Sequence, residues 1–455
     1  MLMDKKLAQK SFLLKDPKTL LLFVAVSLCF KNTHSIGLLL FGVITCFEVY
    51  QLFRNKISNQ YFFTIYFYLL IYASIFYDSI HKIILCILLL FFLKLIVNRK
   101  IKSRIPKKLN EYLFLMIFIL ITLNHLIFPP YLKGLDIFIY FLLIPLLFLG
   151  IKKLHFKICI ITSLKVYITS VFIASVLLFI INIFQRKLMS SVHTFFSEPI
   201  GLSHVYMGVF LGTSNMFLLY LNSKKKSFIS PITDSIFFMF NTALMAYIGS
   251  RLALLTSCFI LLLFIYQKIK IKPIKKITII FVLTVIFIFL ASENSRFKRG
   301  TQEISALYTA VKTENKQNLI DNSWKNMYLR YLAYDYTFKE LKTSWFLGIG
   351  MQNVEKKISE KIIADGYKYF QGINTHNQYL HFFIGMGILG FLFFIFFIFF
   401  LLKNKEINIY FILFFCFIML TESVLVRGKG ILLFSFFALL FLNKKFVNDK
   451  DCSHC

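Results

Sequence analysis

The chain has 455 residues, of which 58% are hydrophobic and 18% aromatic, and its formal net charge is +31. A soluble protein could not bury that much apolar surface, because folded chains of this size already leave much of theirs in water. The basic residues form short clusters between apolar stretches, which is typical of cytoplasmic loops in membrane proteins and argues against a nucleic-acid partner. Composition and charge together predict an integral membrane protein.

Apolar stretches of spanning length follow one another along most of the chain. They predict an all-α fold, a polytopic transmembrane helical bundle of about 12–14 spans. Residues 391–400 contain only Phe, Leu and Ile, and such runs lack the alternation of barrel strands. In chain order the candidate spans are residues 18–30, 35–53, 60–76, 81–98, 111–128, 134–150, 165–186, 203–222, 233–249, 252–268, 276–292, 379–402, 406–422 and 429–443.

The basic clusters between these spans indicate the orientation of the bundle. The richest are residues 98–108, 152–157, 224–226 and 268–276, with Lys444 and Lys445 after the last span. With about fourteen spans they all fall on one side, which the positive-inside rule makes the cytoplasm. We therefore expect a multi-pass protein of the bacterial inner (cytoplasmic) membrane with both termini in the cytoplasm. Residues 187–202, 250–251, 293–378 and 423–428 then face the periplasm.

The long polar loop, residues 293–378, is the only extended polar interval in the chain. Apolar residues at helical spacing predict a helix over about residues 323–342, with Arg330 near its middle. A second periodic stretch from Val354 to Ile362 predicts another helix, which Gly366 would end. The loop is therefore expected to be partly helical and to carry chemistry at the periplasmic face.

We divide the chain into three parts on this basis. Residues 1–202 are expected to form amino-terminal transmembrane helices. Residues 203–443 form a membrane domain that includes the periplasmic loop, and residues 444–455 form a cytoplasmic tail. No internal repeat or low-complexity linker separates these parts.

The candidate catalytic residues lie at the predicted outer ends of spans. Arg251 stands between two spans that leave almost no loop, where a basic residue runs against the positive-inside trend. Arg330 lies on the loop helix, and His376 and Asn377 precede the next span. Snorkelling or surface exposure would account for each of them alone. Together they predict a site at the membrane face.

Further polar residues occur at the same predicted face. His204 and Tyr206 begin an earlier span, and Glu422 and Arg427 flank the last outer turn. The simplest expectation for Glu422 and Arg427 is an ion pair between the two. We take all four, with Asn377, as candidate substrate-binding residues.

This combination of side chains suits a lipid-linked phosphate substrate. Arginine binds phosphate oxygens in a bidentate manner and keeps its charge, and a neutral histidine can accept the proton of an attacking hydroxyl. No nucleotide-binding or Asp-rich metal motif occurs in the outer loops. Cys452 and Cys455 are too few ligands for a zinc site. We therefore expect no cofactor and no metal.

Four short motifs follow one another within residues 203–443: Ser250-Arg-Leu-Ala-Leu-Leu255, Gly348-Ile-Gly350, His376-Asn-Gln-Tyr-Leu380 and Gly385-Met-Gly-Ile-Leu-Gly390. In their order and placement they resemble the O-antigen ligase and polymerase superfamily, and the resemblance covers roughly residues 203–443. The resemblance implies an inner-membrane glycosyltransferase that uses undecaprenyl-diphosphate-linked glycans in the periplasm. It also implies that Arg251 and Arg330 hold the donor diphosphate and that His376 activates the acceptor.

The acceptor stays open at this point. An O-antigen ligase would transfer the glycan to lipid A-core, an O-antigen polymerase would extend a second lipid-linked glycan, and an oligosaccharyltransferase would modify protein hydroxyls. A polysaccharide transporter or flippase is the non-enzymatic alternative, for which Glu48 within a span is the one supporting residue, since transporters place polar sites near the midplane. Membrane lipid is a partner in every case.

Overall fold

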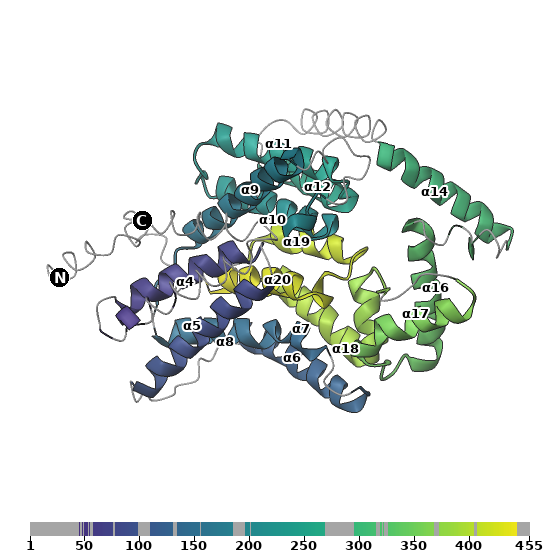
Figure 1. Cartoon of the computed structure of the whole chain (residues 1–455), viewed down its shortest axis with the longest axis horizontal. Coiled ribbons are helices and arrows are strands. Elements are labelled where there is room, and N and C mark those ends of the chain that lie inside the picture. The colour runs from purple at the N-terminus through teal and green to yellow at the C-terminus, as the bar shows by residue number, and fades with distance from the viewer. Residues whose placement is uncertain are drawn as a thin grey trace. The chain divides into compact units, whose positions relative to one another are not determined.

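The computed structural model describes the greater part of the chain, and every element in that part is a helix (Figure 1). The described residues are 58–75, 78–98, 110–130, 134–154, 156–184, 196–200, 202–268, 295–314, 326–367, 373–404 and 407–443, with single residues at 45–54 and 319–322. The prediction of an all-α fold is confirmed for these residues. The predicted spans 18–30, 276–292 and all but a few residues of 35–53 lie outside them, as does the tail 444–455.

The chain divides into two compact units. Unit 1 comprises Met1–Tyr112, Leu142–Ser250 and Leu432–Cys455, and unit 2 comprises Leu113–Phe141 and Arg251–Ile431. Most of the predicted candidate site residues belong to unit 2.

Unit 1 is built from long apolar helices that pack through aromatic side chains. The ring of Phe217 lies 4.6 Å from that of Phe437, and Tyr167 contacts Phe437 at 5.0 Å. Serine side chains cap three of the helices by accepting a backbone N–H, as serine does at helix starts. Its helices are α4 (Asn59–Ala73), α5 (Asp78–Asn98), α8 (Tyr140–Leu154), α9 (Ile160–Phe184), α10 (His204–Ser223), α11 (Pro231–Tyr247) and most of α20 (Gly428–Leu442).

Unit 2 combines apolar helices with the helices of the polar loop. The helices that begin or lie in it are α6 (Asn110–Ile127), α7 (Leu135–Phe138), α12 (Arg251–Lys268), α14 (Ser295–Lys312), α16 (Asn326–Ser344), α17 (Val354–Ala364), α18 (Gln378–Lys403) and α19 (Ile409–Met419). Short 3-10 turns, η4 (Met351–Asn353) and η5 (Val424–Val426), lead into α17 and α20.

The predicted spans in the described part coincide with helices, although their number as spans stays a prediction. By length and composition, three helical stretches among the described residues could cross a membrane: Leu135–Leu154, Ile160–Phe184 and Gln378–Lys403. Shorter apolar helices include Ile409–Met419 and Gly428–Leu442. The periplasmic position of the loop likewise stays a prediction.

The two helices predicted in the polar loop are present. α16 carries Arg330 in its first half, and α17 ends at Ala364, two residues before Gly366, whose φ of 89° is the left-handed conformation typical of a residue after a helix. The two helices lie side by side (Figure 1) and share a core that includes Leu332, Ile358 and Ile384. Burial of this apolar face holds the loop helices against the start of α18.

α18 is bent sharply at Gly387, although its sequence reads as one apolar stretch. Gly387 has φ 67° and ψ −169°, a conformation open almost only to glycine. The rings of Phe382 and Phe394 lie 4.2 Å apart, and those of Phe383 and Phe391 lie 5.1 Å apart. Residues twelve apart on a straight helix would be about 18 Å apart, so the arm before Gly387 folds back towards the arm that follows.

The polar loop pairs with this bend through its backbone. Ile349 N–H donates to Ile384 O at 2.9 Å, Gly350 N–H to Gly385 O at 3.0 Å, and Ile388 N–H to Trp345 O at 2.9 Å. Glycine permits the close approach of the two segments, because a Cβ on Gly348 would overlap the Gly385 carbonyl and a Cβ on Gly387 would overlap the Phe346 carbonyl. The groups that the bend releases from the helix are therefore satisfied by the loop.

Asn124 of α6 extends the same network. Its Nδ2 donates to Gly385 O at 3.1 Å and its Oδ1 accepts from Met351 N–H at 2.8 Å. One buried side chain thus links α6 to the bend and to the loop turn.

We expect Gly387→Ala to detach the loop from α18. Its Cβ would overlap the Phe346 carbonyl, and a strained backbone alone costs about 1–3 kcal/mol, so the loss of stability should exceed about 3 kcal/mol. Gly366→Ala is the matched control, because Gly366 also has positive φ but open space around it. Thermal unfolding in detergent should show a large loss for Gly387→Ala only. Equal losses would mean that contact with the loop does not stabilise the bend.

Candidate active site

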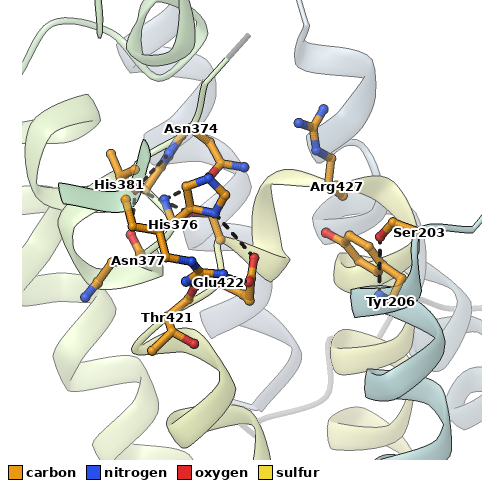
Figure 2. A network of polar contacts seen from close by, with 12 residues as sticks. Ser203, Tyr206, Asn374, His376, Asn377, His381, Thr421, Glu422 and Arg427 are labelled. Atoms are coloured by element: carbon orange, nitrogen blue, oxygen red, sulfur yellow. Dashed lines mark hydrogen bonds and ion pairs between the residues drawn. The ribbon is translucent and has the colours of Figure 1, made fainter. Parts of the chain in front are cut away.

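The centre of the candidate site is the carboxylate of Glu422, which follows α19. Arg330 on α16 donates from Nη2 to Glu422 Oε1 and from Nη1 to the Thr421 carbonyl, the latter at 2.5 Å. His376 Nδ1 lies 3.6 Å from the other carboxylate oxygen. Figure 2 shows the imidazole directed at Glu422. The structure thus brings together Arg330, His376 and Glu422, which lie far apart in the sequence.

His376 is held in an unusual backbone conformation. Its φ is 46°, which a non-glycine residue adopts only at an energetic cost. Its N–H donates to Asn374 Oδ1 at 2.8 Å, and its carbonyl accepts from Tyr334 Oη at 3.3 Å. Tyr334 stands four residues after Arg330, so one face of α16 holds both Glu422 and the backbone of His376.

The segments on either side of the site are joined by short polar contacts. Thr375 Oγ1 lies 3.2 Å from Ser423 Oγ, and Gln378 Oε1 accepts from Leu425 N–H at 2.6 Å. Asn377 Oδ1 accepts the Leu380 N–H as the cap of α18, and its Nδ2 donates to Leu420 O at 2.9 Å. The polar atoms of the Asn377 side chain are therefore engaged in holding the site together.

The expected ion pair between Glu422 and Arg427 is wrong. Arg427 Nη2 instead contacts Glu355 Oε1 of α17 at 3.2 Å, while Glu422 pairs with Arg330. Nearness in sequence suggested the first pairing, but the turn at η5 directs Arg427 away from Glu422 (Figure 2). Glu355 was missed, since an acidic residue in the first turn of a helix is common.

The two carboxylates have pKa shifts of opposite sign. Burial raises the pKa of Glu422, but the nearby His376 and the charge of Arg330 outweigh burial and hold the pKa below the usual range. For Glu355 burial dominates and raises its pKa, although Arg427 and His376 oppose it. Glu422 is therefore the carboxylate that the site keeps ionised.

Arg251 begins α12, and its guanidinium lies against Gly300 of α14. A Cβ at position 300 would overlap the guanidinium, so glycine makes room for it. α12 and α19 run antiparallel, because Phe259 packs on Phe417 at 5.2 Å and Tyr410 Oη donates to Gln267 at 2.9 Å. The start of α12 therefore lies at the end of the pair where α19 gives way to Glu422.

His204 and Tyr206 belong to unit 1, where they lie in the first turn of α10. Tyr206 N–H donates to the capping Ser203 hydroxyl at 3.4 Å. The other predicted site residues belong to unit 2. Among the described residues, no three His, Cys, Asp or Glu side chains gather so that they could hold a metal ion. Metal independence stays a prediction.

We expect Glu422→Gln and Glu355→Gln to affect stability in opposite ways. Hydrogen bonds to charged groups contribute about 1.5–3 kcal/mol, so Glu422→Gln should lower the melting temperature at pH 7. A depressed pKa stabilises the fold above the unfolded pKa, and this contribution is lost as the pH falls through the folded value. The deficit of Glu422→Gln should therefore shrink in acid.

Glu355 has a raised pKa, so its charged form opposes folding at neutral pH and the penalty disappears on acidification. Glu355→Gln should be neutral or stabilising at pH 7. Melting temperatures between pH 4 and pH 7 in detergent test both expectations. A Glu422→Gln deficit that grows in acid would contradict the assignment of Glu422 as the ionised partner.

Part of the chain matches a known protein family. Residues 235–395 match the family described as O-antigen ligase. The matched segment runs from α11 into α18 and contains Arg251, Arg330 and His376, whereas Glu422 lies beyond it. No curated protein matches the chain. This match supports the O-antigen ligase superfamily, and together with the apolar helices it indicates a bacterial membrane protein with a glycosyltransferase-like function of the O-antigen ligase and polymerase type.

Proposed function

We propose that the protein transfers a glycan from undecaprenyl diphosphate to an acceptor hydroxyl at the periplasmic face of the inner membrane, as an O-antigen ligase that acts on lipid A-core. The observation that carries the proposal is the Arg330–Glu422–His376 cluster, two of whose members fall in the O-antigen ligase segment. It combines an anion-binding group with a base, which is what this transfer needs.

His376 serves as the general base in this proposal. A proton on Nδ1 faces the Glu422 carboxylate, which leaves Nε2 as the acceptor. Glu422 fixes the imidazole and stabilises the charge that the ring acquires, as a carboxylate does beside a catalytic histidine. His381 is less suited, because it is buried and its Nδ1 lies 3.5 Å from Thr375.

The reaction then proceeds in one displacement. The acceptor oxygen bonds to the anomeric carbon as the bond from that carbon to the diphosphate oxygen breaks, and the hydroxyl proton passes to His376. Inversion at the anomeric carbon follows from attack on the opposite face. Arg330 and Arg251 stabilise the charge that develops on the departing undecaprenyl diphosphate. No nucleotide or metal enters this scheme.

The identity of the acceptor is a separate part of the proposal, because three kinds of enzyme share the donor. An O-antigen polymerase and a protein O-oligosaccharyltransferase would use the same donor and the same cluster. Lipopolysaccharide from a deletion strain distinguishes them. Loss of all O-chain with accumulation of lipid-linked polymer supports the ligase, core with a single repeat supports the polymerase, and unchanged lipopolysaccharide with unglycosylated protein supports the third.

We expect Arg330→Ala to lower the rate of transfer by about a hundredfold or more, the usual effect of removing one charge-stabilising donor. Arg251→Ala should have a similar effect. Transfer from a lipid-linked donor in detergent measures both, and it also excludes a pure transporter, since no membrane is crossed. Lys339→Gln is the control on α16, because Lys339 is exposed and its described contacts, with Asp335 and the Tyr336 ring, stay within α16. Normal transfer by both arginine variants would refute the diphosphate site.

His376→Ala should reduce turnover by about 10²–10⁴-fold while donor binding persists. His376→Gly offers a sharper test, because glycine adopts a φ of 46° without strain. Added imidazole should restore part of its turnover and give no increase with wild-type protein. An unrestored His376→Gly variant that still binds donor would argue against the base, and full activity of His376→Ala would exclude it.

A further inference from the structure

Three large apolar side chains stand exposed at the end of α16. Trp345 is 54% exposed, Phe346 53% and Leu347 54%. They follow a helix that carries Lys339 and Lys342 on its surface. Consecutive exposed residues of this size mark a surface that contacts another apolar phase.

The exposure does not result from a loose chain end. Trp345 O accepts from Ile388 N–H at 2.9 Å, and Gly348 N–H donates to Ser344 O at 2.8 Å. The Phe346 carbonyl lies against Gly387. The backbone of the turn is therefore fixed beside the bend in α18.

α18 also exposes large apolar side chains. Beyond the bend, the exposed apolar residues of α18 recur at helical spacing and form one face. They are Leu389, Leu392, Phe396 and Phe399, which are 50–63% exposed. This arm belongs to a helix that is apolar enough to cross a membrane, so lipid is the phase that this face contacts.

The position of the bend along α18 also indicates how deep Gly387 lies in the bilayer. From Ile388 to Lys403 the helix rises about 22 Å at 1.5 Å per residue, most of a hydrocarbon core of about 30 Å. With Lys403 at one boundary, Gly387 lies near the other, where tryptophan is enriched. α6 ends nearby, since Phe128 lies against Gly350. Lys339 and Lys342 then lie where anionic headgroups would be.

We propose that the turn Trp345–Leu347 is a membrane anchor, whose three side chains enter the boundary between headgroups and acyl chains of the bilayer. The occupant of this surface is bulk lipid. The anchor fixes the height of α16 above the membrane and does not depend on the reaction proposed above.

Tryptophan fluorescence tests the anchor directly, because the chain contains only two tryptophans. Trp324→Phe leaves Trp345 as the sole reporter. In vesicles of phosphatidylcholine and phosphatidylglycerol, its emission should be blue-shifted. Lipids brominated near the headgroup end of the acyl chain should quench it strongly, lipids brominated near the chain terminus less, and aqueous iodide hardly at all.

Trp345→Phe is the matched control and reports the response of Trp324 alone. If Trp324→Phe fails to fold, the difference between wild type and Trp345→Phe gives the same quantity. Quenching by iodide without quenching by brominated lipid would overturn the anchor in favour of water. Protection from both quenchers would overturn it in favour of a protein contact. Neither result would bear on glycan transfer, which is measured separately in detergent.

Discussion

The arrangement of the candidate site depends on one carboxylate. Glu422, which follows α19, accepts a hydrogen bond from Arg330 of α16 and faces His376, which precedes α18. It therefore joins the loop helix α16 to the segment before α18 and to the segment after α19. Without it a half-buried arginine would lose its carboxylate partner beside a histidine, and an unpaired charge is costly away from water. The positions of both side chains follow from this contact.

A second attachment fixes the other end of α16. The residues that directly follow α16 pair with the bend at Gly387 through backbone hydrogen bonds, each worth about 1 kcal/mol. α16 is thus held at Arg330 by charge and at Trp345 by backbone pairing. A helix fixed at both ends cannot tilt independently, and this keeps Arg330 in register with the start of α18.

The sequence predicted the parts of this arrangement that depend on local patterns. Helical spacing located α16 and α17, and Gly366 marked the end of the second helix, because these signals act within a few residues. The bend at Gly387 could not be predicted, since hydropathy averages over residues 379–402 and does not sense one backbone conformation. The partner of Glu422 was missed for a related reason. Arg330 precedes it by 92 residues, and only the fold brings them together.

Under the proposed function, the ion pair of Glu422 and Arg330 has a consequence for selectivity among lipids. A bacterial membrane contains a large excess of phospholipids that carry a single negative charge, and an arginine without a carboxylate partner would bind them readily. Because Glu422 already neutralises Arg330, a singly charged headgroup gains little by replacing it. A diphosphate carries more charge on adjacent oxygens and can compete. The Glu422 carboxylate would thus exclude singly charged lipids from Arg330 and admit only a multiply charged one. The same competition would lower the affinity for the proposed donor.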